Sequence, residues 1–153
     1  MTRILLLNGP NLASLGEREP AVYGTVTLPD IEAAVRARAA ELGLEVTCEQ
    51  TNHEGGMVDI IEAERGTSAG CIVNPGGLTH TSVVLADALR GFGGPIIEVH
   101  LSNILAREQF RRVSLSAEAA AAVITGLGLH GYVLAVEGLA KLLEERPPLG
   151  STA

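Results

Sequence analysis

Four short apolar runs recur along the chain, each rich in Leu, Ile or Val and bounded by turn residues. They are residues 3–7 (RILLL), 44–50 (LEVTCEQ), 70–75 (GCIVNP) and 95–100 (PIIEVH). Runs of this length and composition are typical of strands that are buried on both faces of a parallel sheet. A fifth run, residues 121–125 (AAVIT), follows the segment SAEAA, so its start is compatible with either a helix or a strand.

The segments between these runs have the three- to four-residue apolar spacing of amphipathic helices. They are LPDIEAAVRARAAELG, MVDIIEAERG, SVVLADALRG and YVLAVEGLAKLLEER. The first carries Asp30 and Glu32 in its first turn and Gly43 just past its end, which is typical of helix boundaries. Alternating strands and helices predict right-handed crossovers and an α/β fold with helices on both faces of a parallel sheet. Five strands in this length predict a flavodoxin-like order, 2-1-3-4-5.

The length of 153 residues and the apolar content of 46% suit one domain with a single core. We expect residues 1–145 to form this domain and residues 146–153, with two prolines and small polar residues, to be a disordered tail. The net charge of −7, with no Lys/Arg cluster beside aromatic residues, argues against a nucleic-acid partner.

Neither a targeting signal nor a membrane anchor is predicted. The opening MTRILLLNGPN has no small-residue cleavage site, and the most apolar long window, residues 119–136, contains three glycines and a histidine. Cys48 and Cys71 fall in predicted strands without CxxC spacing. We therefore expect a reducing, cytoplasmic setting and no membrane partner.

Polar segments follow three of the predicted strands: NGPNLASLGEREPAVYGTVT, NPGGLTHTS and EVHLSN. Each alone is typical of an ordinary turn or helix cap. In doubly wound folds, however, ligands bind beyond the carboxyl ends of the strands, where these segments would meet. They would bring together more polar side chains than turns require, namely Asn8, Asn11, Asn74, Thr79, His80, His100 and Ser102. Because Gly76 and Gly77 would let backbone N–H groups approach an anion, we predict a small ligand with a carboxylate.

Two pairs of side chains in these segments suggest acid–base chemistry. Glu98 and His100 are two positions apart on one strand and point to the same face, and a carboxylate beside an imidazole fixes its tautomer, which suits a general acid. In REPAVYG, Arg18 lies five residues before Tyr23, and a guanidinium would favour the phenolate that a tyrosine base requires. Residues 15–27 are long enough to form a lid. The alternatives are a strand-end histidine without a chemical role and a surface loop with Tyr23 packed on the sheet.

The segment GLGLHG, residues 126–131, matches the G-x-G-x-x-G pattern of dinucleotide sites. No later strand presents the acidic residue expected on the ribose, so we interpret the segment as a tight turn with close helix packing. The four histidines lack metal-ligand spacing, and we predict no metal.

Six motifs, in their order and spacing, resemble those of the type II 3-dehydroquinate dehydratases of the shikimate pathway. They are NGPNL, REPAVYG, TNHEGGMVD, NPGGLTHTSV, EVHLSN followed by REQFR, and GLGLHGY, and the resemblance covers about residues 4–137. It implies reversible anti elimination of water from 3-dehydroquinate to 3-dehydroshikimate through an enolate, without a cofactor. This lyase reaction serves chorismate and aromatic amino-acid biosynthesis or quinate catabolism.

The resemblance also implies roles for individual residues. Tyr23 matches the base that takes a proton from the carbon next to the ketone, and Arg18 matches the residue that favours the phenolate. His100 matches the acid that protonates the departing hydroxyl, assisted by Glu98, and Asn11 matches the residue that holds a water against the enolate oxygen. The substrate contacts implied are Asn74, His80, Leu101, Ser102 and Arg111, with Asp87 reaching the site from a neighbouring subunit. Family members are typically dodecamers built from trimers, so a homo-oligomer is implied.

Two other classes of function compete with this one. The first is a nucleotide- or flavin-binding module that uses GLGLHG, and the second is a catalytically silent oligomeric scaffold. The presence of Arg18, Tyr23 and His100 together argues against a scaffold. The single lysine, Lys141, is on the last predicted helix and distant from the polar segments, which argues against an imine-forming route to the same product.

Overall fold

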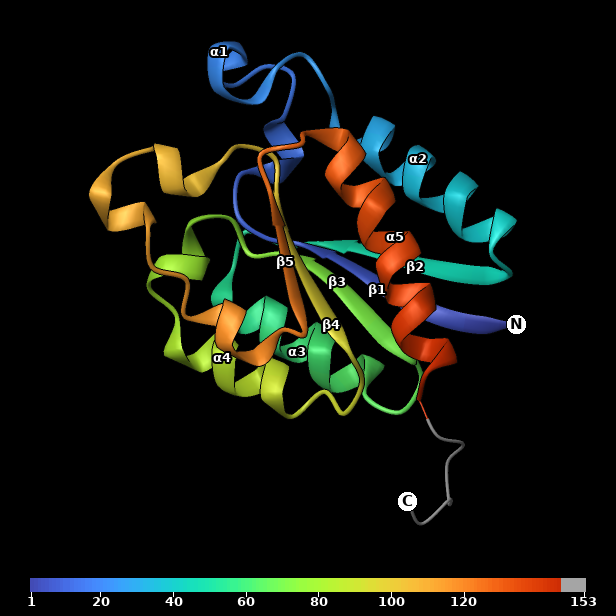
Figure 1. The fold of residues 1–153 in the computed structure, drawn as a ribbon. Helices are drawn as coiled ribbons and strands as arrows, with labels where there is room; N and C mark the ends of the chain where they lie inside the picture. Colours follow the sequence, from blue (N-terminus) through green and yellow to red (C-terminus); the bar gives the residue numbers. More distant parts are fainter. Residues whose placement is uncertain (147–153) are drawn as a thin grey trace.

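A computed structural model describes residues 1–146 (Figure 1). Its centre is a five-stranded parallel sheet in the order β2-β1-β3-β4-β5, which confirms the predicted flavodoxin-like topology. The strands are β1 (Thr2–Asn8), β2 (Leu44–Gln50), β3 (Gly70–Asn74), β4 (Ile96–His100) and β5 (Ala122–Thr125). Apart from Arg146, the predicted tail of residues 146–153 lies outside the described residues.

Helices cover both faces of the sheet, as the alternating pattern predicted. One layer holds α2 (Leu28–Glu41) and α5 (Leu129–Glu144), and the other holds α3 (Glu54–Glu64) and α4 (Val83–Arg90). The short helix α1 (Pro20–Tyr23) protrudes at the top of Figure 1, beyond the carboxyl ends of the strands. No helix in the described part of the chain is both long and apolar enough to cross a membrane.

The strand β1 contributes side chains to both layers. Ile4 and Leu6 pack with residues of α2 and α5. Leu5 and Leu7, each one position away, pack with residues of α3 and α4. All four are fully buried. A central strand of this kind has no polar face, which explains why residues 4–7 are all apolar.

Local hydrogen bonds explain where α2 and α4 begin. The Thr27 hydroxyl accepts from the Asp30 N–H and the Asp30 carboxylate accepts from the Thr27 N–H, so α2 begins with a capping box. The Ser82 hydroxyl accepts from the Leu85 N–H at the start of α4, so this serine caps the helix.

Several element boundaries differ from the prediction, and α5 begins at Leu129 rather than Tyr132. The helix α3 begins at Glu54 rather than Met57 and so includes two glycines, which have a low helix propensity. Gly56 is required there because a Cβ would lie 2.6 Å from the Thr51 hydroxyl oxygen. The ambiguous segment before β5 is a short 3-10 helix, Ser116–Ala119, and residues 122–125 form a strand.

Candidate active site

A cavity of about 140 Å³ opens at the carboxyl ends of β1, β3 and β4. The fold brings eight of the predicted site residues to its wall: Asn11, Arg18, Asn74, His80, His100, Leu101, Ser102 and Arg111. A larger hollow of about 530 Å³ lies at the opposite ends of the strands, between residues such as Thr2, Phe92 and Leu143. None of the predicted site residues lines that hollow.

The remaining three predicted residues lie elsewhere. Glu98 is on β4 and is completely buried behind His100. Asp87 is on the exposed side of α4, where its carboxylate accepts a hydrogen bond from Arg90 at 3.1 Å. Tyr23 is the last residue of α1, in the same stretch of chain as Arg18.

Two loops form the base of the cavity by packing unusually close to each other. The Gly9 N–H donates to the Asn74 carbonyl at 2.8 Å. A Cβ on Gly9 would lie 2.7 Å from the Pro75 carbonyl oxygen, and one on Gly76 would lie 2.9 Å from the Pro10 carbonyl oxygen. Gly76 also has a φ of +60°, which disfavours any other residue. These glycines therefore let the ends of β1 and β3 share one binding surface.

The charge of the cavity differs in sign from that of the whole chain. The chain has a net charge of −7, yet three arginines line the cavity: Arg18, Arg107 and Arg111. None of the described residues that line it is acidic. Guanidinium groups are the side chains best suited to bind a carboxylate, so the site favours an anionic ligand.

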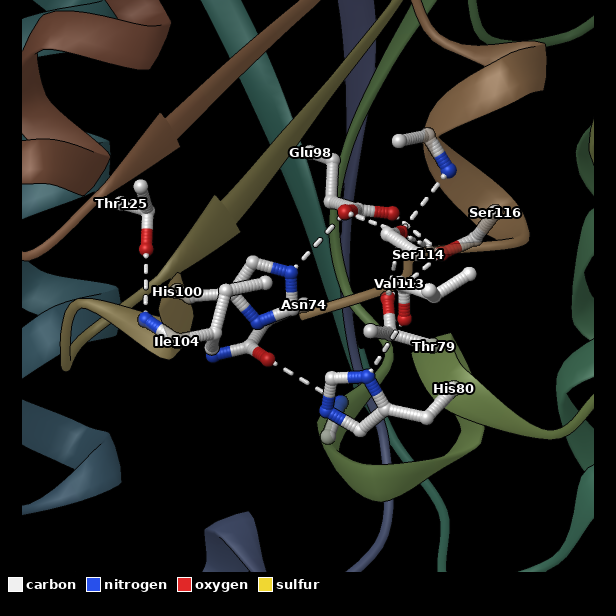
Figure 2. A network of polar contacts seen from close by, with 12 residues as sticks. Asn74, Thr79, His80, Glu98, His100, Ile104, Val113, Ser114, Ser116 and Thr125 are labelled. Atoms are coloured by element: carbon white, nitrogen blue, oxygen red, sulfur yellow. Dashed lines mark hydrogen bonds and ion pairs between the residues drawn. The ribbon is translucent and has the colours of Figure 1, made fainter. Parts of the chain in front are cut away.

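His100 and Glu98 form a buried hydrogen-bonded pair at the cavity wall (Figure 2). The His100 Nε2 is 2.9 Å from the Glu98 Oε2, and the two residues are 5% and 0% exposed. Because an ionised carboxylate can only accept, Nε2 carries a proton in this pair. The other ring nitrogen, Nδ1, is then the atom that can exchange a proton with a ligand.

Two serines that the sequence interpretation missed complete the surroundings of Glu98. The Ser114 hydroxyl donates to Glu98 Oε2 at 2.8 Å, and the Ser116 hydroxyl donates to Oε1. Burial raises the pKa of the Glu98 carboxyl, but the hydrogen bonds from His100, Ser116 and Ser114 outweigh it and hold the pKa below its ordinary value. The carboxylate is therefore kept charged beside His100.

No sequence pattern marked these serines, because they lie outside the strand-end segments. They precede β5, and the path of the chain from β4 to β5 brings them to Glu98. The same stretch of chain supports the neighbouring loop: the His80 Nδ1 donates to the Val113 carbonyl at 2.7 Å, and the Leu115 N–H donates to the Thr79 carbonyl at 2.7 Å. This contact leaves the His80 Nε2 available to the cavity.

Arg107 is a further cavity residue that the sequence interpretation did not single out. Its Nη1 is 3.4 Å from the Ser102 hydroxyl oxygen. The motif REQFR, which supplied Arg111, begins with it. The two arginines are four residues apart, across a 3-10 turn, Gln109–Arg111, that places both at the cavity.

The glycine motif at residues 126–131 forms a turn, as interpreted. Gly126 and Gly128 have positive φ angles, and their N–H groups donate to the carbonyls of His100 and Leu101 at 3.2 and 3.0 Å. The motif thus supports the end of β4. Within residues 1–146, no group of three or more His, Cys, Asp or Glu side chains is placed to hold a metal ion.

Together, the doubly wound sheet, the cationic cavity and the histidine–glutamate pair define an α/β protein built for acid–base chemistry on a small anion. The family model for class II dehydroquinases matches residues 2–140. The chain belongs to this family.

Individual relatives agree with this assignment. The chain is 56% identical over 138 residues to the 3-dehydroquinate dehydratase 1 of Corynebacterium efficiens, covering 90% of this chain and 91% of the relative. It is 51% identical over 146 residues to the catabolic 3-dehydroquinase 1 of Aspergillus fumigatus, covering 95% and 97%. The crystal structure of the type II dehydroquinase from Propionibacterium acnes superposes with a TM-score of 0.88 at 43% identity, covering 92% of this chain and 97% of that one.

Proposed function

We propose that this chain is a hydro-lyase that reversibly converts 3-dehydroquinate to 3-dehydroshikimate. The observation that carries the proposal is the buried His100–Glu98 pair in an arginine-lined cavity, in a chain of the dehydroquinase class II family. The substrate is a carboxylate with a ketone and a hydroxyl that must leave, and the cavity offers cationic groups and an acid for these features.

The reaction requires a base and an acid. Tyr23, as phenolate, removes a proton from the carbon between the ketone and the carbon that bears the leaving hydroxyl, which gives an enolate. Arg18 lines the cavity five residues before Tyr23 and favours the phenolate by its charge. The stretch from residue 15 to residue 27, which includes α1 beyond the strand ends, acts as a lid over the bound substrate.

His100 completes the elimination as the general acid. Its imidazolium, with Nε2 hydrogen-bonded to Glu98, donates a proton to the departing hydroxyl as the C–O bond breaks, and water leaves. Anti geometry requires the base and the acid to act from opposite faces of the substrate ring. The proton that Tyr23 gained and the one that His100 lost then exchange with solvent.

The other cavity residues hold the substrate and the enolate. Asn11, at a φ of 72° in the loop after β1, holds a water against the enolate oxygen. The substrate's carboxylate and hydroxyl groups are bound by Asn74, His80, Leu101, Ser102 and Arg111. Lys141 takes no part, since it lies near the far end of α5, within 4 Å of Glu144 and Glu145.

We also propose that the enzyme is a homo-oligomer, a dodecamer built from trimers, in which Asp87 approaches a neighbour's cavity. Support comes from large apolar side chains that are 54–66% exposed around α4 and the 104–113 segment: Val83, Val84, Leu105, Phe110 and Val113. Burial of such side chains favours association. The free Cys48 and Cys71 support a cytoplasmic location, where the reaction serves aromatic biosynthesis or quinate breakdown.

Ultraviolet absorbance tests the reaction, because the conjugated enone carboxylate of the product absorbs where the substrate does not. We expect wild-type protein to produce this absorbance from 3-dehydroquinate, and Tyr23→Phe, which lacks an ionisable hydroxyl, to lose turnover while retaining substrate affinity. Absorbance from both proteins would assign the base to another residue. No absorbance from either would overturn the proposed activity.

A further inference from the structure

Tyr132 lies completely buried beneath the cavity, on the first turn of α5 directly after the glycine motif. Its hydroxyl oxygen is 2.8 Å from the Asn74 Nδ2 and 2.7 Å from the Asn8 Oδ1. Of these three residues, Asn74 alone lines the cavity. Tyr132 therefore contacts a substrate-binding side chain from behind without reaching the substrate.

The backbone fixes the direction of these hydrogen bonds. The Gly76 N–H donates to the Asn74 Oδ1 at 3.0 Å, so the opposite end of the amide, Nδ2, faces Tyr132 and donates to its hydroxyl. A phenol has one proton, which Tyr132 donates to the Asn8 Oδ1. The chain of donors runs in one direction only, from Asn74 to Tyr132 to Asn8.

This arrangement leaves the Asn8 Nδ2 buried without a hydrogen-bond partner among the described residues. An unpaired buried donor is unfavourable for folding. The network thus holds the Asn74 amide in one orientation and leaves the buried Asn8 Nδ2 unpaired within the described residues.

We propose that Tyr132 is a positioning residue that orients the Asn74 amide for substrate binding. One Nδ2 proton of Asn74 is used by Tyr132, and the second is directed into the cavity, where it donates to an oxygen of the substrate. The inference rests on the proposed dehydration of 3-dehydroquinate and adds a residue to it that no strand-end segment contains.

The glycine motif sets the position of Tyr132. The turn through Gly126 and Gly128 is hydrogen-bonded to the end of β4, and α5 begins immediately after it. At Gly131, a Cβ would lie 3.3 Å from the Ile124 side chain, so the glycine allows α5 to approach the sheet closely. One motif thus supports both the His100 end of β4 and the hydroxyl that holds Asn74.

Steady-state kinetics of Tyr132→Phe tests the inference, because the variant removes only the hydroxyl. We expect KM for 3-dehydroquinate to rise roughly 3- to 10-fold, the factor associated with one neutral hydrogen bond, with kcat changed less than about twofold. Val136→Ala is the matched control. It removes buried methyl groups one turn further along α5, and it should lower the melting temperature without changing KM.

A double-mutant cycle with Asn74→Ala separates positioning from general loosening of the fold. If Tyr132 acts through Asn74, adding Tyr132→Phe to Asn74→Ala changes KM no further. Asn8→Ala is the second variant, which removes the acceptor of the Tyr132 proton and should raise KM by a smaller factor. An unchanged KM in Tyr132→Phe overturns the inference. If Tyr132→Phe does not fold, an unchanged KM in Asn8→Ala overturns it instead. Additive effects on KM in the double-mutant cycle also overturn it. Wild-type turnover in the same assay tests the proposed function separately.

Discussion

At the scale of single residues, the buried carboxylate of Glu98 shows how the site keeps a charge out of water. Its two oxygens accept hydrogen bonds from His100, Ser114 and Ser116, which replace the water lost on burial. Because its folded-state pKa lies below its ordinary value of 4.5, ionised Glu98 stabilises the folded protein. This stabilisation is complete above the pKa of the unfolded chain and is lost as the pH falls through the lower pKa of the folded state.

We therefore expect Glu98→Gln to reduce the free energy of unfolding by about 1–3 kcal/mol at pH 7, since its amide donors would face other donors. Below pH 4.5 the wild type should lose more stability than the variant. Urea denaturation at pH 7 and at a pH below 4.5 measures both effects. Glu62→Gln, at an exposed carboxylate on α3, is the control and should follow the wild type. Parallel pH dependence in wild type and Glu98→Gln would contradict this role for the charge.

At the scale of elements, the sequence predicted the sheet well because the central strands β1, β3 and β4 contain short apolar runs with both faces buried. Cys71, Ile72 and Val73 in β3 show this pattern. The expectation of two buried faces was wrong for β2, an edge strand on which Glu45 and Glu49 are exposed. The start of α3 was not predicted, because the reason for Gly56 is the closeness of Thr51, a contact that helix propensity does not describe. The periodicity of apolar residues likewise does not predict contacts between loops and helices that are distant in sequence.

Some residues of the candidate site could likewise be proposed from the sequence, and others could not. Asn74 and His100 could be proposed because they end strands whose carboxyl ends must meet, and His80 because it lies in the segment after β3. Ser114 and Ser116 were missed because their approach to Glu98 depends on the path of the chain between β4 and β5. The spacing of Arg18 and Tyr23 suggested a tyrosine base, the family resemblance gave its specific role, and both stay predictions until the base is tested.

The loop contact at Gly76 gives a prediction at this scale. Gly76→Ala would place a methyl group 2.9 Å from the Pro10 carbonyl oxygen at a φ of +60°. The left-handed conformation alone costs about 1–2 kcal/mol. We expect a lower melting temperature and a lower kcat/KM, because the Gly76 N–H that holds Asn74 would shift. Gly77→Ala, where a Cβ meets nothing within 4 Å, is the control for stability and should melt close to the wild type. Equal melting temperatures for the two variants would show that the loops can separate freely.

At the scale of the whole molecule, the exposed apolar side chains around α4 predict association. We expect light scattering after size exclusion to give about twelve times the chain mass of 15.9 kDa. Val84→Glu would place a charge where Val84 is 54% exposed, close to Asp87 on the same helix, and should yield smaller species. A wild-type monomer, or a Val84→Glu variant of unchanged mass, would contradict this interface.

The charge of the whole molecule also differs from that of its cavity. The chain is acidic, but arginines line the cavity at the carboxyl ends of the strands. Long-range attraction of the substrate is therefore weak, and affinity depends on the arginines inside the cavity. This places the discrimination between substrates in the cavity itself. The assignment of Tyr23 as the base and His100 as the acid is the point on which the mechanism depends.

Proton NMR of 3-dehydroquinate in D2O, with wild type, His100→Ala and Tyr23→Phe beside an enzyme-free control, tests that assignment. The wild type should form the dehydrated product. His100→Ala should exchange the proton next to the ketone for deuterium without losing water, because the enolate forms but the hydroxyl finds no acid, whereas Tyr23→Phe should do neither. Loss of water by His100→Ala at a rate near that of the wild type would contradict the assignment of His100 as the acid. Exchange by Tyr23→Phe above the enzyme-free control would contradict the assignment of Tyr23 as the base.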